Sequence, residues 1–97
     1  MRISFTNRAQ NIYNSIKLYL SEEWGEKSAE TFEQKTIDFF DLLKTFPEMG
    51  SIEFPEKQIR GFQLTKQTRI LYRIKNQSII VLAFFDVRQN PKKIIKE

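Results

Sequence analysis

Two arginines in a strand-like segment are the residues of this chain best placed to do chemistry. Arg69 and Arg73 stand in "TRILYRI", where they alternate with apolar residues. Successive side chains of a strand point to opposite faces, so Ile70, Tyr72 and Ile74 are predicted to face a core and both arginines to lie on the other face. A guanidinium group in that position can hold a phosphate through two parallel hydrogen bonds.

Further basic residues are predicted to join these two arginines. Arg60 belongs to the preceding strand, Arg88 follows the next strand, and Lys92 and Lys93 lie in the basic tail "QNPKK". With the aromatic pair of "LAFFDV" close by, such a cluster could bind a nucleic acid through phosphate contacts and base stacking. The alternative is that the arginine stems cover apolar sheet surface while their guanidinium groups pair with Asp or Glu. The pattern alone favours this alternative.

Composition excludes several kinds of site. The chain has 97 residues, which predicts one domain spanning residues 1–97, and a net charge of +4 with neither Cys nor His. A thiolate nucleophile, the usual zinc ligand sets and any His-based triad are therefore excluded, and we expect no metal or cofactor. Residues 1–56 carry a net charge of −4 and residues 57–97 a net charge of +8. This asymmetry indicates a basic face that meets a polyanion or an acidic partner.

The apolar segments favour a cytoplasmic protein without a membrane partner. The longest apolar run, "IIVLAFF", is far too short to cross a bilayer. The first residues, "MRISFTNRAQ", lack the apolar segment of a secretory signal.

The elements that must position the arginines are predicted from periodicity and breakers. "RISF" is typical of a short strand, Asn7 with Gln10 predicts a helix start, and Gly25 predicts its end. A second helix is predicted over residues 26–45. Helical spacing places two sets of residues on the inner sides: Ala9, Ile12, Tyr13, Ile16 and Leu20, then Ala29, Phe32, Thr36, Phe40 and Leu43. "IRGFQL", "TRILYRI" and "SIIVLAFFDV" predict three antiparallel strands. The expected fold is α+β, with a strand and a two-helix hairpin packed on an antiparallel sheet.

This order of elements resembles the RelE/ParE superfamily of bacterial toxins, and most closely its ParE branch. The resemblance covers nearly the whole chain and is carried by Tyr19, by the corner "WGEKSA", by "LLKTFPEMG" ending in Gly50, by "RILYRI" and by the last long strand. It implies the toxin of a type II toxin–antitoxin pair, a growth inhibitor of the kind that stabilises plasmids. It also implies that an antitoxin partner holds the toxin inactive by wrapping its C-terminal segment around it.

The resemblance implies two competing mechanisms. RelE-like members look like ribosome-dependent endoribonucleases that cleave mRNA, whereas ParE-like members poison DNA gyrase. The positions that match the RelE lysines are Gly61 and Gln63, and those that match the catalytic His and Tyr of other members are Val87 and Arg88. Arg69 matches an arginine that the RNases use, and Arg88 is an approximate counterpart of another.

Because general acid–base catalysis lacks its usual residues here, gyrase inhibition leads by elimination and enzymatic activity stays open. Arg69 and Arg88 are the candidates for catalysis if the chain is an RNase. A third possibility is an orphan toxin fold that only binds an antitoxin.

Overall fold

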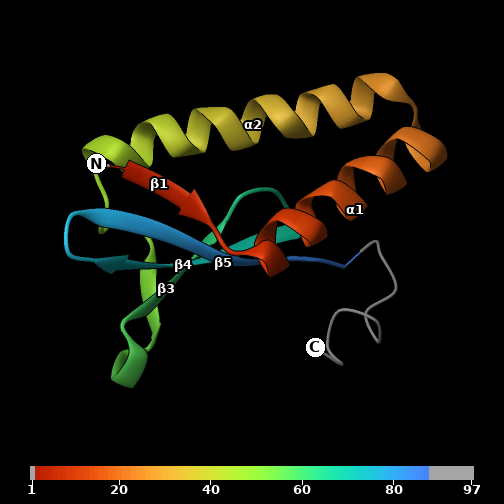
Figure 1. Cartoon of the computed structure of the whole chain (residues 1–97). Coiled ribbons are helices and arrows are strands. Elements are labelled where there is room, and N and C mark those ends of the chain that lie inside the picture. The colour runs from red at the N-terminus through yellow and green to blue at the C-terminus, as the bar shows by residue number, and fades with distance from the viewer. Residues whose placement is uncertain (1, 88–97) are drawn as a thin grey trace.

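The computed structural model describes residues 2–87. An N-terminal strand, β1 (Arg2–Phe5), leads into two helices, α1 (Asn7–Trp24) and α2 (Glu26–Thr45). Four strands follow: β2 (Ser51–Phe54), β3 (Ile59–Gln63), β4 (Thr68–Lys75) and β5 (Ser78–Asp86), with a short 3₁₀ helix, η1 (Pro55–Lys57), after β2. Figure 1 shows the two helices lying together over one side of the sheet. The predicted α+β order is confirmed.

The five strands form one sheet in the order β1-β5-β4-β3-β2. The three pairings from β2 to β5 are antiparallel, and those of β3 with β4 and of β4 with β5 were predicted, while β1 pairs with β5 in parallel. A parallel pairing needs a long connection between the two strands, and here α1, α2 and the strands β2 to β4 supply it. The long strand β5 therefore lies inside the sheet, with a neighbour on each side.

The first helix begins one residue earlier than predicted. Thr6, not Asn7, is the capping residue, because its hydroxyl accepts a hydrogen bond of 3.0 Å from the Ala9 amide. The same hydroxyl donates to the Leu82 carbonyl at 3.2 Å, so the cap also joins the end of β1 to β5. Gly25 ends α1 as predicted, with a φ of 99° that a residue with a Cβ rarely adopts.

The core lies between the helices and the inner face of the sheet. Its buried residues include Ile16, Leu43, Ile70 and Tyr72, all at most 1% exposed. The prediction of Phe40 as a core residue is wrong, since Phe39 is the buried phenylalanine and Phe40 is only partly buried. Phe39 stacks on Phe62 of β3 with ring centroids 4.4 Å apart, whereas Phe40 meets Phe5 edge-on.

A β-bulge interrupts the regular alternation of β5, a strand that is apolar on both faces. Leu71 pairs with Ala83 but Tyr72 pairs with Val81, so Leu82 is an extra residue in the ladder. The bulge shifts the alternation, and Phe84 is buried along with Val81. Because Val81 and Phe84 are three positions apart, regular alternation would have placed their side chains on opposite faces of the sheet.

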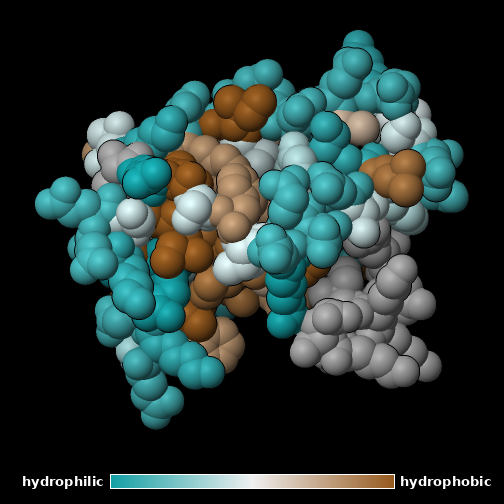
Figure 2. All heavy atoms as spheres, in the orientation of Figure 1, coloured by the Kyte–Doolittle hydropathy of each residue, from teal (hydrophilic) through white to brown (hydrophobic). Residues whose placement is uncertain are grey.

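Strand β2 was not predicted. It is a four-residue edge strand in which Ile52 and Phe54 are about half exposed, so it lacks the alternating burial that marks a strand in sequence. Figure 2 shows other apolar side chains gathered beside β1 and along α2, within a mostly hydrophilic surface. Neither helix in the described part of the chain has the length and apolar character needed to cross a membrane.

Candidate functional site

The outer face of the sheet, which is the face turned away from α1 and α2, carries both arginines of β4. Ile70 and Tyr72 are buried in the core, so the alternating residues Arg69 and Arg73 point the other way. Arg69 pairs in register with Phe85 of β5, and Arg73 pairs with Ile80 of the same strand. The structure thus brings together two guanidinium groups and the aliphatic or aromatic side chains of the neighbouring strand.

Arg69 is engaged by two polar partners. Its guanidinium forms an ion pair with Glu53 of β2 and donates a 3.1 Å hydrogen bond to the Oε1 atom of Gln63 in β3. The ion pair passes over Gly61 of the intervening strand, where a Cβ atom would collide with both the Glu53 carboxylate and the Arg69 guanidinium. The Glu53–Arg69 ion pair therefore occupies the space that a larger side chain at position 61 would fill. A carboxylate already occupies the position that a substrate phosphate would take at Arg69.

Arg73 has different surroundings. Its register neighbours are Ile59 of β3 and Ile80 of β5, which are both apolar. The Nε atom is buried without a hydrogen-bond partner, and no carboxylate of residues 2–87 lies within ion-pair distance of the guanidinium. Arg73, which has no carboxylate partner among residues 2–87, is therefore the guanidinium of this face that is left to receive an anion from another molecule.

The expectation that Arg60 joins this cluster is wrong. Arg60 pairs directly with Tyr72, and residues opposite each other in an antiparallel ladder share a face. Its side chain therefore lies on the helix side, where it donates hydrogen bonds to the carbonyl oxygens of Glu48 and Gly50 at 3.1 and 2.7 Å. Arg60 holds the loop after α2 and does not belong to the outer face.

Comparison with known proteins assigns the chain to a family. A family model described as "ParE toxin of type II toxin-antitoxin system, parDE" matches residues 3–91. The chain belongs to the ParE toxin family. The predicted resemblance to the ParE branch is thereby confirmed.

Solved structures with this ParE-family fold have low sequence identity to the chain. A chain of the chromosomal ParDE toxin–antitoxin system from P. aeruginosa superposes with a TM-score of 0.73 at 20% identity, covering 90% of this chain and 96% of the other. A YoeB/ParE toxin from Agrobacterium tumefaciens gives a TM-score of 0.65 at 15% identity, with 89% and 98% covered. No curated protein sequence matches the chain. These structures support the fold of this ParE-family chain.

A tyrosine network that sequence reasoning missed supports the loop after α2 in this ParE-family chain. The Tyr72 hydroxyl donates to the Pro47 carbonyl and accepts from the Gly50 amide, both at 2.9 Å. Burial raises the pKa of Tyr72, while the Gly50 hydrogen bond and the Arg60 charge act in the opposite direction. The signal that could have found the network is a tyrosine at a core position, because a buried hydroxyl needs partners.

The remaining predicted site residues of the ParE-family chain, Arg88, Lys92 and Lys93, lie outside the described residues. Within residues 2–87, no three acidic residues lie close enough together to hold a metal ion. The arrangement that the structure does describe suits binding of an anionic or acidic partner. It has one guanidinium that is already paired and one that is not.

Proposed function

We propose that this ParE-family chain is the toxin of a type II toxin–antitoxin pair, that it inhibits DNA gyrase in the cytoplasm and that a cognate antitoxin neutralises it. The proposal rests on the contacts that the two arginines make on the outer face of the sheet. Arg69 is held by Glu53 and Gln63, and Arg73 sits among apolar side chains. Such a face is suited to binding a protein surface through charge and apolar contact.

The alternative, a ribosome-dependent endoribonuclease, finds less support in the geometry. Cleavage needs a group that takes the proton of the 2′-hydroxyl and cations that stabilise the charged transition state. Gly61 and Gln63, where the RelE pattern has lysines, serve the Arg69 ion pair. Tyr72 is buried on the opposite face with its hydroxyl engaged, and the sequence has no histidine. The carboxylate beside Arg69, that of Glu53, is held in the ion pair with this guanidinium.

A two-arm assay separates the mechanisms. We expect the purified chain to inhibit negative supercoiling of a relaxed plasmid by gyrase and to leave mRNA on purified ribosomes intact. Adding the protein encoded beside this gene should restore supercoiling, because the proposed antitoxin competes for the toxin. The matched control is the same toxin with an unrelated acidic protein of equal charge.

Two outcomes would contradict the proposal. Ribosome-dependent cleavage of mRNA with unaffected gyrase would assign the chain to the RNase mechanism. Inactivity toward both targets, together with tight binding of the neighbouring protein, would indicate the orphan toxin fold. Expression from an inducible promoter, with growth and the SOS response as readouts, tests the same distinction in cells.

A further inference from the structure

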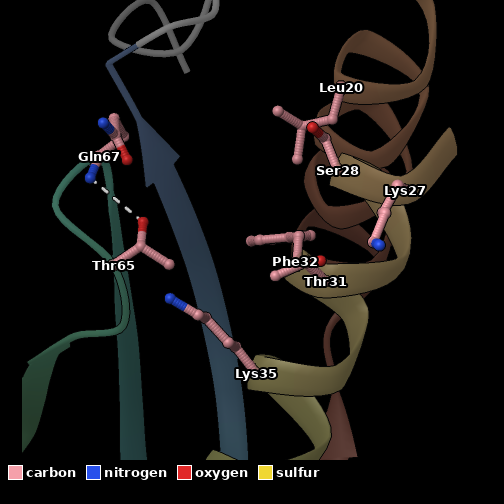
Figure 3. Close-up of a pocket in the computed structure, with 8 residues that line it drawn as sticks. All are labelled: Leu20, Lys27, Ser28, Thr31, Phe32, Lys35, Thr65 and Gln67. Carbon is pink, nitrogen blue, oxygen red and sulfur yellow. Dashed lines mark hydrogen bonds between the residues drawn. The ribbon is translucent and has the colours of Figure 1, made fainter. Parts of the chain in front are cut away.

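A cleft lies between the first half of α2 and the turn that joins β3 to β4. It encloses about 250 Å³ and lies away from the loop that Arg60 and Tyr72 hold. Lys27 and Lys35 of α2 line one wall, and Thr65 and Gln67 of the turn line the other. Figure 3 shows Lys35 extending across the cleft toward Thr65.

The two lysines carry positive charge that the described part of the chain does not neutralise. No acidic residue lines the cleft, and no carboxylate of residues 2–87 forms an ion pair with Lys27 or Lys35. Several carboxylates of α2 are engaged elsewhere: Glu26 accepts from Ser21, Glu33 pairs with Lys17 at 3.4 Å, and Asp38 accepts from Gln34 at 3.0 Å. The cleft therefore offers two ammonium groups to an acidic ligand.

The base of the cleft is apolar and the opposite wall is polar. Leu20 and Phe32 contribute the apolar lining from α1 and α2. On the other wall, the Thr65 hydroxyl accepts from the amides of Gln67 and Thr68 at 3.1 and 3.0 Å, which fixes the turn. The side-chain amide of Gln67 forms no hydrogen bond with the rest of residues 2–87, so it is available to a peptide backbone.

The spacing of the lysines specifies the length of a matching segment. Lys35 lies eight positions after Lys27 in the α-helix, a rise of about 12 Å. Four residues of extended chain span about 13 Å, and the first, third and fifth side chains of such a segment share one face. Two carboxylates four residues apart can therefore reach both lysines while the residue midway between them points at Leu20 and Phe32.

We propose that this cleft binds an extended segment of a partner protein with the pattern acidic-x-apolar-x-acidic. The inference rests on the proposed function, in which the partner is the antitoxin, and it names the chemistry of one docking segment. A nucleic acid strand would satisfy the lysines but would leave the apolar base without a matching group. The amphipathic lining thus favours a peptide.

Fluorescence anisotropy with a labelled Glu-x-Leu-x-Glu peptide and the full chain tests the cleft directly. We expect saturable binding that weakens about tenfold in the Lys27→Glu/Lys35→Glu double variant, because two attractions become repulsions. The Lys44→Glu/Lys57→Glu variant is the matched control, since it makes the same charge change at exposed positions outside the cleft. Thermal melting of both variants checks that they fold.

Peptide variants test the spacing and the chemistry. Moving the second Glu one residue further, or replacing both by Gln, should weaken binding to the level of the lysine variant. Equal loss in the control variant, or equal binding of the shifted peptide, would show attraction by net charge alone and overturn the proposal. An oligonucleotide that displaces the peptide from the wild-type chain but not from the lysine variant would also overturn it.

Binding of the neighbouring antitoxin separates failure of this inference from failure of the proposed function. An antitoxin that binds the Lys27→Glu/Lys35→Glu chain as tightly as the wild-type chain would remove the cleft from the interface and leave the toxin assignment intact. If the Lys27→Glu/Lys35→Glu chain loses tight antitoxin binding and the Lys44→Glu/Lys57→Glu control keeps it, the result supports both the cleft inference and the proposed function. A chain that binds the peptide through the cleft but no antitoxin would keep the cleft chemistry and contradict the proposed function.

Discussion

Arg69 and Arg73 lie four residues apart on one face of β4, yet within residues 2–87 only Arg69 has a carboxylate partner. Glu53 reaches Arg69 across Gly61, while Arg73 is flanked by isoleucines. Identical side chains on one strand therefore differ in what they can bind, because the adjacent strands place different groups beside them.

The hydroxyl of Tyr72 holds the loop after α2, so removing it should destabilise the fold. Tyr72→Phe keeps the ring in the core but leaves the amide of buried Gly50 without an acceptor. We expect a loss of roughly 1–3 kcal/mol in the free energy of unfolding, measured by urea denaturation. Tyr19→Phe is the control, because its hydroxyl has no hydrogen bond in residues 2–87. Equal stability of the two variants would show that the loop does not depend on Tyr72.

Tyr13 predicts how stability changes at high pH. Burial, and after it the nearby charge of Glu33, raises the pKa of Tyr13 from its ordinary value of 10.0 to about 12. The folded chain then keeps a proton that the unfolded chain releases, so the free energy of unfolding should fall as the pH rises from 10.0 to about 12. Urea denaturation along this pH range measures the slope. A Tyr13→Phe chain should lose less stability over the same range, and an unchanged slope would contradict the assignment.

At the scale of elements, the register of α2 decides which phenylalanine supports the core. Phe39 is 3% exposed and stacks on Phe62, whereas Phe40 lies at the flank against Phe5. Phe39→Ala should cost roughly 3–5 kcal/mol in the free energy of unfolding, and Phe40→Ala clearly less. Urea denaturation of the two variants gives both values. A larger loss for Phe40→Ala would show that α2 is rotated relative to the sheet.

The helices and the three long strands could be predicted because each has a strong local signal. Gly25 ends α1, and "TRILYRI" alternates between core and outer residues. Two features depend on contacts that local sequence does not contain. The cap at Thr6 also donates a hydrogen bond to the distant Leu82 carbonyl, and β2 pairs with β3 although its Ile52 is exposed.

The outer face could be predicted only in part. Alternation within β4 correctly separated Arg69 and Arg73 from Tyr72. The position of Arg60 did have a signal within its own strand, because alternation in "IRGFQL" puts Arg60 on the same face as the core-packed Phe62 and Leu64. Glu53 could not be predicted as a partner because its strand was not recognised.

On the scale of the whole molecule, the fold gathers basic residues from both halves of the sequence. Arg2 and Lys75 both pair in register with Ser78, and they alternate with the core-packed Ile3 and Ile74, which directs them to the outer face that also carries Arg69 and Arg73. The helices carry most of the acidic residues. Charge separation along the sequence therefore becomes charge separation between the two sides of the sheet. Such separation orients an approaching acidic partner.

The last prediction tests this orientation and rests on the proposed function. Arg73→Glu should slow association with the cognate antitoxin roughly threefold to tenfold at low salt and flatten its salt dependence, because long-range attraction acts mainly on the association rate. Stopped-flow binding at two ionic strengths measures both. Arg73 is preferred to Arg69, since a glutamate at position 69 would face Glu53 and disturb the sheet.

Lys44→Glu in α2 is the matched control, because it makes the same charge change at an exposed position on the helix side of the sheet. Its association rate should fall less than that of Arg73→Glu, since steering depends on where the charge lies as well as on its sum. If both variants associate equally slowly, the association rate depends on the net charge of the chain and not on the position of Arg73. If the association rate changes neither with salt nor with either substitution, the antitoxin binds away from the outer face. Arg73 would then be free to bind a different anionic partner.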